Sequence, residues 1–343
     1  MSTLTTPAPL RILLSDAARD CVGPRIANAL GPRPIELLSI NALATSPIAD
    51  AIIDADIAFI SRDVTGRSTK HELAPALQAC YDTLRHAPSL QWVHLHSAGA
   101  DRPVYGDLQA RGVAITTSSG TNASAVAQTA IAGLLTLARR FPQLMAEQRS
   151  HTWAPLIDSN GIALPRDLEG QTAVVVGWGP IGQHIGRLLT ALGLRAVVVR
   201  RSALAVDGVD RVVGFDALNQ VLPQADWLIL ACPLTDTTRG LIDRNALALL
   251  PPGAELINVA RGEVVNEPDL IAALQSGQLA GAFLDVFAHE PLPADSPLWD
   301  LPNVIVTPHT AGHSDGHFER VAQSFTDNLV RWLAGQPLAN RVG

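Results

Sequence analysis

The sequence predicts an α/β protein with two domains, each built on a parallel β-sheet covered by helices. The chain has 343 residues, and domains of roughly 100–200 residues make two the natural number. Hydrophobic residues make up 47% and charged residues 17%, which is ample apolar material for two cores. Short apolar or β-branched runs alternate with longer helical patterns along the whole chain. This alternation is typical of βαβ units, in which consecutive strands are parallel.

The first block of the chain contains short apolar segments of strand length. A helical pattern over residues 72–86 separates two of them. The predicted strands are Leu10–Leu14, Ile35–Ser39, Ile57–Ser61, Gln91–His96 and Val113–Thr117.

A long helical pattern follows over residues 122–140 and is rich in Ala and Leu. It begins after a turn of small and polar residues at 118–121, which is a typical helix start. We expect this helix to cross from the first domain to the second. Residues 150–170 then have the composition of a loop.

The second block repeats the alternation of strands and helices. Its predicted helices are residues 181–192, 243–249 and 267–275. Its predicted strands are Thr172–Val176, Arg195–Val199, Arg211–Val213, Trp227–Ala231, Glu255–Val259, Ala282–Val286 and Val304–Thr307.

A last helix over residues 318–333 follows the final strand of the second block and has no evident place within it. We expect it to pack back on the first domain. The first domain then comprises residues 1–118 and 312–343, and the second comprises residues 119–311. Hinges are expected where the chain crosses, near residues 118 and 312.

Composition excludes several classes of protein. The formal net charge is −7 with no basic stripe, which argues against a nucleic-acid partner. No run of 18 apolar residues could cross a membrane, and the first ten residues do not form a signal peptide. The three cysteines are far apart and form no CxxC pair, as is usual in a reducing compartment. We therefore expect a cytoplasmic protein.

A glycine-rich turn lies directly after one predicted strand and directly before a helix. Gly177, Gly179 and Gly182 match the G-x-G-x-x-G pattern, and Pro180 and Ile181 open the helix. In a Rossmann-like domain such glycines allow a tight turn, a close approach to a pyrophosphate and close packing of helix on strand. The free N–H groups of the helix start would face the phosphates. The alternative is an ordinary strand-to-helix turn with no ligand.

The end of the next strand predicts which dinucleotide binds. NAD sites usually carry Asp or Glu there, whereas this strand runs into Arg200, Arg201 and Ser202. Guanidinium groups and a hydroxyl would bind the 2′-phosphate of NADP, which a carboxylate would repel. The sequence therefore favours NADP(H), with NAD(H) as the alternative cofactor. In the other interpretation, both arginines are ordinary solvated charges.

Three further strand ends carry groups suited to catalysis. Arg261, Glu290 and His309 each come just after an apolar strand. Because ligands bind beyond the carboxyl ends of parallel strands, a cation, an acid and an imidazole are expected on one rim.

Taken together, these motifs carry a family resemblance. They are the glycine-rich turn, the loop at residues 96–101 and the segments 232–238, 258–262, 285–292 and 307–312. With them the chain resembles the D-isomer-specific 2-hydroxyacid dehydrogenases, which include glyoxylate/hydroxypyruvate reductases.

The resemblance implies two domains with a cleft between them and assigns roles to the catalytic residues. His309 would protonate the substrate carbonyl oxygen, and Glu290 would hold His309 in the right tautomer and favour its charged form. Arg261 would bind the substrate carboxylate and polarise the keto oxygen. The backbone N–H groups of Ala98, Gly99 and Ala100 would hold the same carboxylate.

The resemblance also implies further contacts to the cofactor and a partner. Asp285 would touch the nicotinamide carboxamide or brace the site. A homodimer through the long crossing helix is expected. The other residues placed at the cofactor are Cys232, Pro233, Val259 and Ala260.

Two other functions fit parts of the sequence. A nucleotide-sensing, corepressor-like interaction protein could use the same fold and the same residues. A zinc hydrolase could use His309, His313 and His317, or His94 and His96. Glycines interrupt the first histidine set, and no acid or cysteine with ligand spacing lies nearby, so no metal site is predicted.

Overall fold

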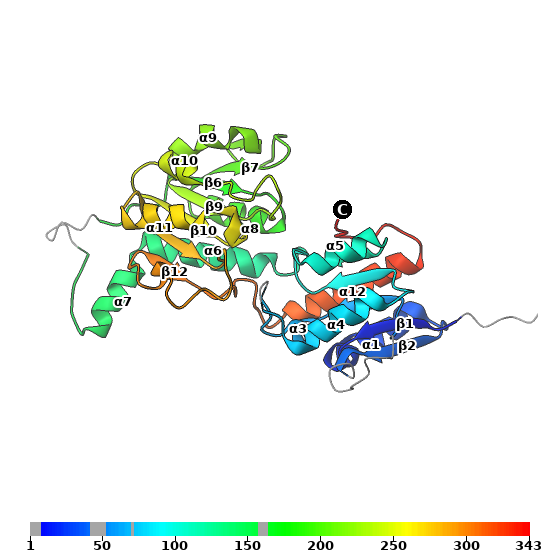
Figure 1. The fold of residues 1–343 in the computed structure, drawn as a ribbon. Helices are drawn as coiled ribbons and strands as arrows, with labels where there is room; N and C mark the ends of the chain where they lie inside the picture. The colour runs from blue at the N-terminus through cyan, green and yellow to red at the C-terminus, as the bar shows by residue number, and fades with distance from the viewer. Residues whose placement is uncertain (1–7, 42–52, 70–71, 157–163) are drawn as a thin grey trace, which may run out of the picture. The chain divides into compact units, whose positions relative to one another are not determined.

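A computed structural model describes residues 8–41, 53–69, 72–156 and 164–343. The chain divides into two compact units (Figure 1). The first comprises Met1–Thr121 and Ser314–Gly343, and the second comprises Asn122–His313. Every strand pairing among the described residues is parallel, apart from one isolated bridge between Thr116 and Arg341.

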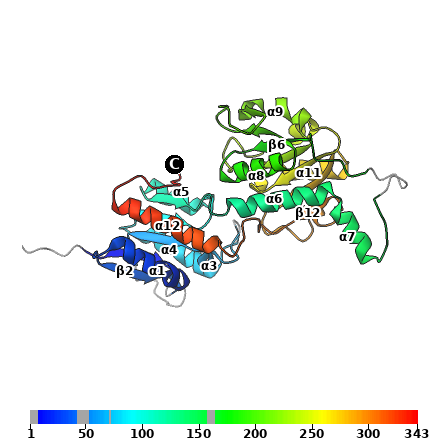
Figure 2. The ribbon, with the colours of Figure 1, turned by 180° about the vertical axis from the view of Figure 1, so that it is seen from behind.

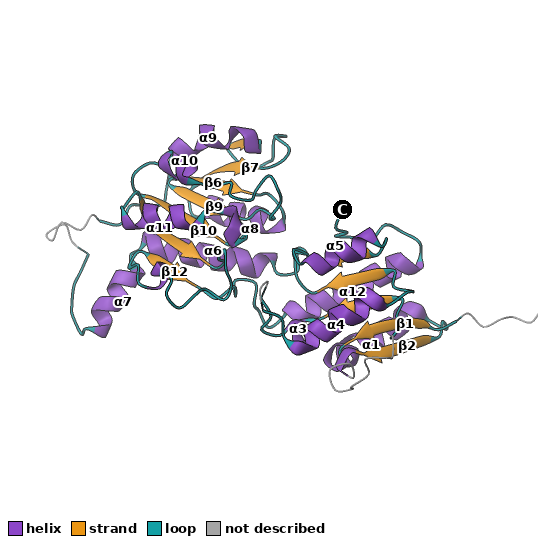
Figure 3. Cartoon of the chain, in the orientation of Figure 1, coloured by secondary structure: helices purple, strands orange, loops and turns teal. Residues whose placement is uncertain are grey.

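The first unit is built on a five-stranded sheet with the order β2-β1-β3-β4-β5. Strands are drawn in orange in Figure 3. Its strands are short and almost entirely apolar on both faces, as expected for a parallel sheet with helices on each side. Their bounds are β1 Leu10–Leu14, β2 Ile35–Ser39, β3 Ile57–Ile60, β4 Trp92–Leu95 and β5 Ala114–Thr117.

Helices cover both faces of this sheet. On one face, α1 (Asp16–Leu30) and α12 (His317–Leu333) share an apolar cluster with the strands. Phe325 of α12 stacks on Phe59 with ring centroids 4.8 Å apart. The last helix thus completes the core of the first unit, which is built from two separate stretches of chain. The other face is covered by α4 (Pro75–His86) and α5 (Pro103–Ala110), and a short helix, α3 (Arg62–Thr65), follows β3.

The second unit is built on a seven-stranded sheet with the order β12-β11-β10-β9-β6-β7-β8. The chain starts in the middle at β6, moves outward through β7 and β8, and then returns to the other side at β9. The strand order therefore reverses between β6 and β9, which is where open α/β sheets bind ligands. The bounds are β6 Thr172–Val176, β7 Arg195–Val199, β8 Arg211–Val213, β9 Trp227–Leu230, β10 Ala254–Asn258, β11 Leu279–Leu284 and β12 Val304–Val306.

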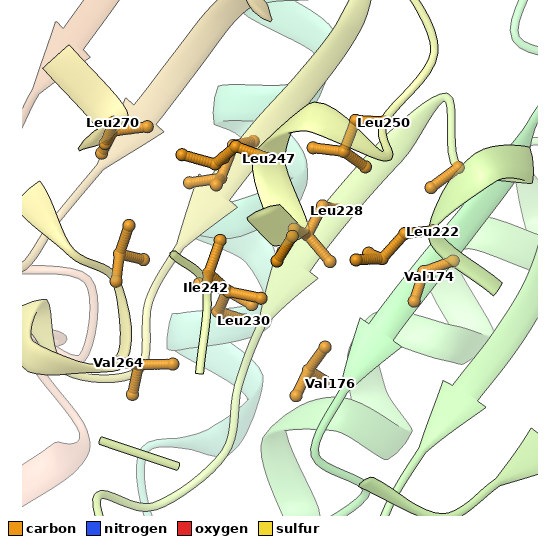
Figure 4. Packing of buried hydrophobic residues seen from close by; sticks show 14 of the residues in the cluster. Val174, Val176, Leu222, Leu228, Leu230, Ile242, Leu247, Leu250, Val264 and Leu270 are labelled. Carbon is orange, nitrogen blue, oxygen red and sulfur yellow. The ribbon is translucent and has the colours of Figure 1, made fainter. Parts of the chain in front are cut away.

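Each face of this sheet has its own apolar core. Helices α6 (Ala123–Ala138) and α8 (Pro180–Ala191) cover one face and lie side by side (Figure 2). Helices α9 (Leu218–Val221), α10 (Arg244–Ala248) and α11 (Glu267–Gln275) cover the other. Figure 4 shows this second core, in which Leu228 and Leu230 of β9 are surrounded by apolar side chains.

The predicted helix over residues 122–140 is observed as α6, which ends at Ala138. A separate helix, α7 (Phe141–Arg149), which was not predicted, begins after Arg140. Arg140 has φ +59°, a left-handed conformation that a continuous helix cannot contain. The predicted strand over 282–286 also differs, because β11 begins at Leu279 and ends at Leu284. The predicted loop over 150–170 lies partly outside the described residues.

Candidate functional site

The glycine-rich turn has the geometry that its pattern predicts. Gly177 has φ +102°, and a Cβ there would lie 2.6 Å from the backbone nitrogen of Cys232. A Cβ on Gly182 would lie 2.1 Å from the carbonyl oxygen of Gly177, so helix and strand pack too closely for a side chain. A Cβ on Gly179 would meet no atom within 4 Å. The turn is thus tight on its inner side and open over the start of α8, where Pro180 and Ile181 follow. An open backbone at a helix N-terminus fits a dinucleotide pyrophosphate.

The two arginines follow the neighbouring strand at the same edge. The Gly177 N–H donates to the carbonyl oxygen of Val199 at 2.8 Å, which places Arg200 beside the glycine-rich turn. Arg200 and Ser202 are half-buried, and Arg201 is exposed. Among the described residues, no carboxylate forms an ion pair with either arginine. Positive charge at the end of β7 is therefore available to an anionic group.

The Arg261 loop is held by the last residue of its strand. Asn258 accepts from the Ala260 N–H at 3.0 Å and donates to the Arg261 carbonyl oxygen at 3.1 Å. The half-buried Arg261 side chain donates to the Ala260 carbonyl oxygen at 2.7 Å. The next residue, Gly262, packs against the backbone of Phe287, where a Cβ would lie 1.8 Å from the carbonyl carbon. The loop that carries Arg261 is thereby fixed to the loop that leads to Glu290.

Glu290 and His309 form a close pair. The Nδ1 of His309 lies 2.8 Å from Oε2 of Glu290, and Oε1 of Glu290 accepts from the Phe287 N–H at 3.1 Å. Glu290 is 8% exposed, whereas the His309 side chain is 47% exposed. Glu267 of α11 accepts from the Ala288 N–H at 3.0 Å and so braces the same loop. A buried carboxylate thus orients the imidazole through Nδ1. No described residue forms a hydrogen bond with its Nε2.

Asp285 organises the loop that presents His309. Its carboxylate accepts from the Thr307 hydroxyl at 2.7 Å, from the Thr310 N–H at 2.8 Å and from the Ala311 N–H at 3.0 Å. The side chain is 2% exposed, and this burial raises the pKa of Asp285, against the opposing effect of those hydrogen bonds. His309 has φ +48° within this loop, a conformation that needs such support. The structure therefore shows Asp285 as a brace of the site; its contact with the carboxamide stays a prediction.

The other predicted cofactor residues lie along the same edge. Cys232 and Pro233 follow β9, and Val259 and Ala260 follow β10. Cys232 is buried, and burial raises the pKa of its thiol to about 11, so it is a neutral, apolar lining residue. Val259 and Ala260 are buried as well, and Pro233 is exposed.

The predicted substrate loop belongs to the first unit, where it follows β4. The N–H groups of Ala98, Gly99 and Ala100 donate to no described residue. The Ser97 hydroxyl donates to the Gly99 carbonyl oxygen at 2.7 Å, which occupies the acceptor side of the loop. Unpaired N–H groups in succession form an anion-binding surface.

The structure thus brings together Asp285, Glu290 and His309 in one hydrogen-bonded cluster and ties the Arg261 loop to it through Gly262. Three supporting residues were missed from the sequence: Asn258, Thr307 and Glu267. The first two are polar residues at the end of apolar strands, a signal that could have found them. Nothing local distinguishes Glu267, because its partner is 21 positions away.

The described residues contain no cluster of three or more metal-ligating side chains. Both ring nitrogens of His94 are taken by Thr116 and Ser118. No helix in the described part of the chain has the length and apolar character needed to cross a membrane.

Residues 131–311 match the family model described as D-isomer specific 2-hydroxyacid dehydrogenase, NAD binding domain.

The chain belongs to this family.

Its members are NAD(P)-dependent oxidoreductases that act on 2-hydroxy and 2-keto acids. This dehydrogenase is 34% identical to glyoxylate/hydroxypyruvate reductase B of Pectobacterium carotovorum over 76% of its own length and 81% of that protein. It is 33% identical to D-3-phosphoglycerate dehydrogenase of Mycobacterium tuberculosis over 76% of its length, but spans only 49% of that protein. A family member from Xanthobacter autotrophicus, solved with NADPH and MES, has a TM-score of 0.77 and 28% identity, covering 98% of both chains.

Proposed function

We propose that this dehydrogenase reduces a small 2-keto acid, such as glyoxylate or hydroxypyruvate, to the D-2-hydroxy acid with NADPH. The observation that carries the proposal is the Glu290–His309 pair, which lies at the edge of the same sheet as the glycine-rich turn. The name of the Pectobacterium relative supports the substrate class. The solved Xanthobacter relative, which holds NADPH, supports the cofactor.

The residues at the site divide the reaction among them. A bound nicotinamide supplies the hydride that adds to the keto carbon. His309 gives the proton of its Nε2 to the keto oxygen, which becomes the hydroxyl. Glu290 accepts from Nδ1 at 2.8 Å, keeps the ring oriented and stabilises the charged imidazolium before transfer. Arg261 and the N–H groups at 98–100 hold the substrate carboxylate.

The preference for NADPH rests on Arg200 and Arg201 beside the glycine-rich turn. A charge-assisted hydrogen bond contributes about 1.5–3 kcal/mol, so one guanidinium on the 2′-phosphate gives roughly tenfold to hundredfold preference. Arg200→Ala lowers kcat/KM for NADPH by that factor and leaves kcat/KM for NADH within about threefold.

The working form is a homodimer in a reducing cytoplasm. Helix α7 buries none of its residues and exposes Phe141 and Met145. A second copy would cover these apolar side chains. The dimer contact therefore includes α7, which follows the crossing helix α6 along the chain. The three cysteines are unpaired, in keeping with a reducing compartment. Sedimentation of the wild type and of Phe141→Glu tests the dimer.

A substrate panel tests the function. Oxidation of NADPH and NADH is followed with glyoxylate, hydroxypyruvate and pyruvate for the wild type and His309→Ala. The variant should lose about 10²–10⁴-fold in kcat while binding NADPH normally. Near-native turnover by the variant would refute the role of His309. Nucleotide binding with no turnover of any keto acid would indicate a nucleotide-sensing protein instead.

A further inference from the structure

A chain of hydrogen bonds runs through the core of the first unit and ends at the predicted substrate loop. The indole Nε1 of Trp92 lies 2.7 Å from the Thr116 hydroxyl, which lies 2.8 Å from Nδ1 of His94. The Nε2 of His94 lies 3.0 Å from the Ser118 hydroxyl. That hydroxyl lies 2.8 Å from the carbonyl oxygen of Leu95. The Trp92 and His94 side chains are fully buried.

The groups at its two ends constrain the direction of the bonds. An indole N–H can only donate, so the Thr116 hydroxyl accepts from Trp92. A carbonyl oxygen can only accept, so Ser118 donates its single proton to Leu95 and must accept from Nε2 of His94. His94 therefore carries a proton on Nε2, and in its neutral form Nδ1 accepts the Thr116 proton.

The surroundings of His94 keep it in this form. Burial lowers the pKa of His94 to about 3, with a smaller contribution from His96. The rings of Phe59 and Phe325 lie within 5.8 Å of its ring, centroid to centroid, so apolar side chains border the imidazole. His94 is thus a neutral donor to Ser118 near neutral pH.

Ser118 connects this chain of hydrogen bonds to the predicted substrate loop. Its hydroxyl donates to the Leu95 carbonyl oxygen, and its N–H donates to the Ser97 carbonyl oxygen at 3.0 Å. The Ser97 hydroxyl in turn donates to the Gly99 carbonyl oxygen at 2.7 Å. The carbonyl groups at both ends of the turn are thereby occupied, and the N–H groups of residues 98–100 are left unpaired among the described residues.

We propose that His94 and Ser118 are positioning residues that hold the Ser97–Ala100 turn with its N–H groups ready for the substrate carboxylate. The inference rests on the proposed function, since it assumes that this turn binds the carboxylate. It predicts that affinity for the substrate carboxylate falls when the hydrogen bond between His94 and Ser118 is removed. The rate of the chemical step should not fall to a comparable extent.

Two substitutions of the same histidine separate positioning from general stability. In His94→Gln the side-chain amide can occupy the place of Nε2 and still donate to Ser118. In His94→Asn the shorter amide reaches only the place of Nδ1 and loses Ser118. Both remove the ring that packs against Phe59 and Phe325, so both should lower the melting temperature to a similar extent.

The readouts are KM and kcat for glyoxylate and the calorimetric dissociation constant of oxalate, a carboxylate probe that needs no turnover. We expect His94→Asn and Ser118→Ala to raise KM and the oxalate dissociation constant about five- to tenfold, as loss of part of one buried hydrogen bond would. We expect kcat within about threefold of the wild type, and His94→Gln within about threefold on every constant. Nitrogen-15 NMR of the His94 ring should show the Nε2-protonated neutral form from pH 8 down to pH 5.

Distinct results would overturn the inference and the proposed function. Equal oxalate affinity in His94→Asn, His94→Gln and the wild type would overturn the positioning role, as would a His94 ring that titrates above pH 5. Loss of oxalate affinity in both histidine variants alike would assign His94 to stability alone. If no keto acid is reduced by the wild type, the proposed function fails, and the oxalate constants still decide the positioning role.

Discussion

Replacing Glu290 by Gln tests the centre of the site with a change of a single atom. The carboxylate joins two donors, Nδ1 of His309 at 2.8 Å and the Phe287 N–H at 3.1 Å. An amide has one oxygen, so it must turn its NH₂ group toward one of the two. If it faces Phe287, two N–H groups oppose each other; if it faces His309, the ring must accept at Nδ1.

The expected loss of kcat follows from these two orientations of the amide. A charge-assisted hydrogen bond contributes about 1.5–3 kcal/mol and a neutral one about 0.5–1.5 kcal/mol, so the loss at His309 is about 1–1.5 kcal/mol. The misplaced amide adds a similar cost in either orientation. Because the His309 side chain is 47% exposed, solvent weakens its interaction with Glu290, and the total free-energy loss lies toward the lower end of these values. We therefore expect kcat to fall about tenfold to hundredfold, since 1.4 kcal/mol corresponds to about tenfold.

The assay is the steady-state reduction of glyoxylate, with NADPH affinity measured separately. Affinity for NADPH should change less than about threefold, because Glu290 contacts the His309 and Phe287 groups rather than the glycine-rich turn. Asp295→Asn is the matched control, since it removes one exposed carboxylate from the same connection between β11 and β12. A Glu290→Gln enzyme whose kcat lies within threefold of the control would refute the assigned role.

Four other substitutions test separate parts of the second unit. Burial raises the pKa of Glu255 from 4.5 to about 7, so the protein loses stability as pH rises between these values. In urea unfolding, Glu255→Gln should therefore be about 3 kcal/mol more stabilising at pH 8 than at pH 4. An equal change in the free energy of unfolding at the two pH values would contradict this. Gly182→Ala should lower stability by about 1–3 kcal/mol because its Cβ meets a backbone oxygen at 2.1 Å, whereas Gly179→Ala should keep the melting temperature but weaken NADPH binding at least tenfold. Asp285→Asn should reduce kcat about tenfold or more, because an amide facing the Ala311 N–H releases the loop that holds His309, and unchanged kcat would count against the brace.

Much of the fold follows from local patterns. The strands of both sheets are short apolar runs, and nearly all of them begin and end within two residues of the predicted bounds. The glycine-rich turn is local in part: Gly177 has a positive φ and Gly182 packs on the Gly177 carbonyl oxygen, whereas the close approach of Gly177 to Cys232 joins distant parts of the chain. The catalytic triplet Arg261, Glu290 and His309 could be proposed from sequence because parallel strands deliver their ends to one edge.

The supporting contacts could not be predicted in this way. The brace from Asp285 to Ala311 spans 26 positions, and the bond from Glu267 to Ala288 spans 21. Their partners are backbone groups, which every residue possesses, so the sequence gives no sign of which one is used. The helix α7, which follows the left-handed residue Arg140, was likewise not predicted from the sequence.

By itself, the sequence determined the elements, the parallel character of the sheets and the chemical groups placed at their edges. Those features depend on side-chain periodicity and on glycine, which act over a few residues. Only the tertiary structure decided the strand order and the direction of the bonds from Trp92 to Ser118. Such features depend on which distant groups meet across a sheet, and a hydrogen bond acquires its direction only when all of its neighbours are in place.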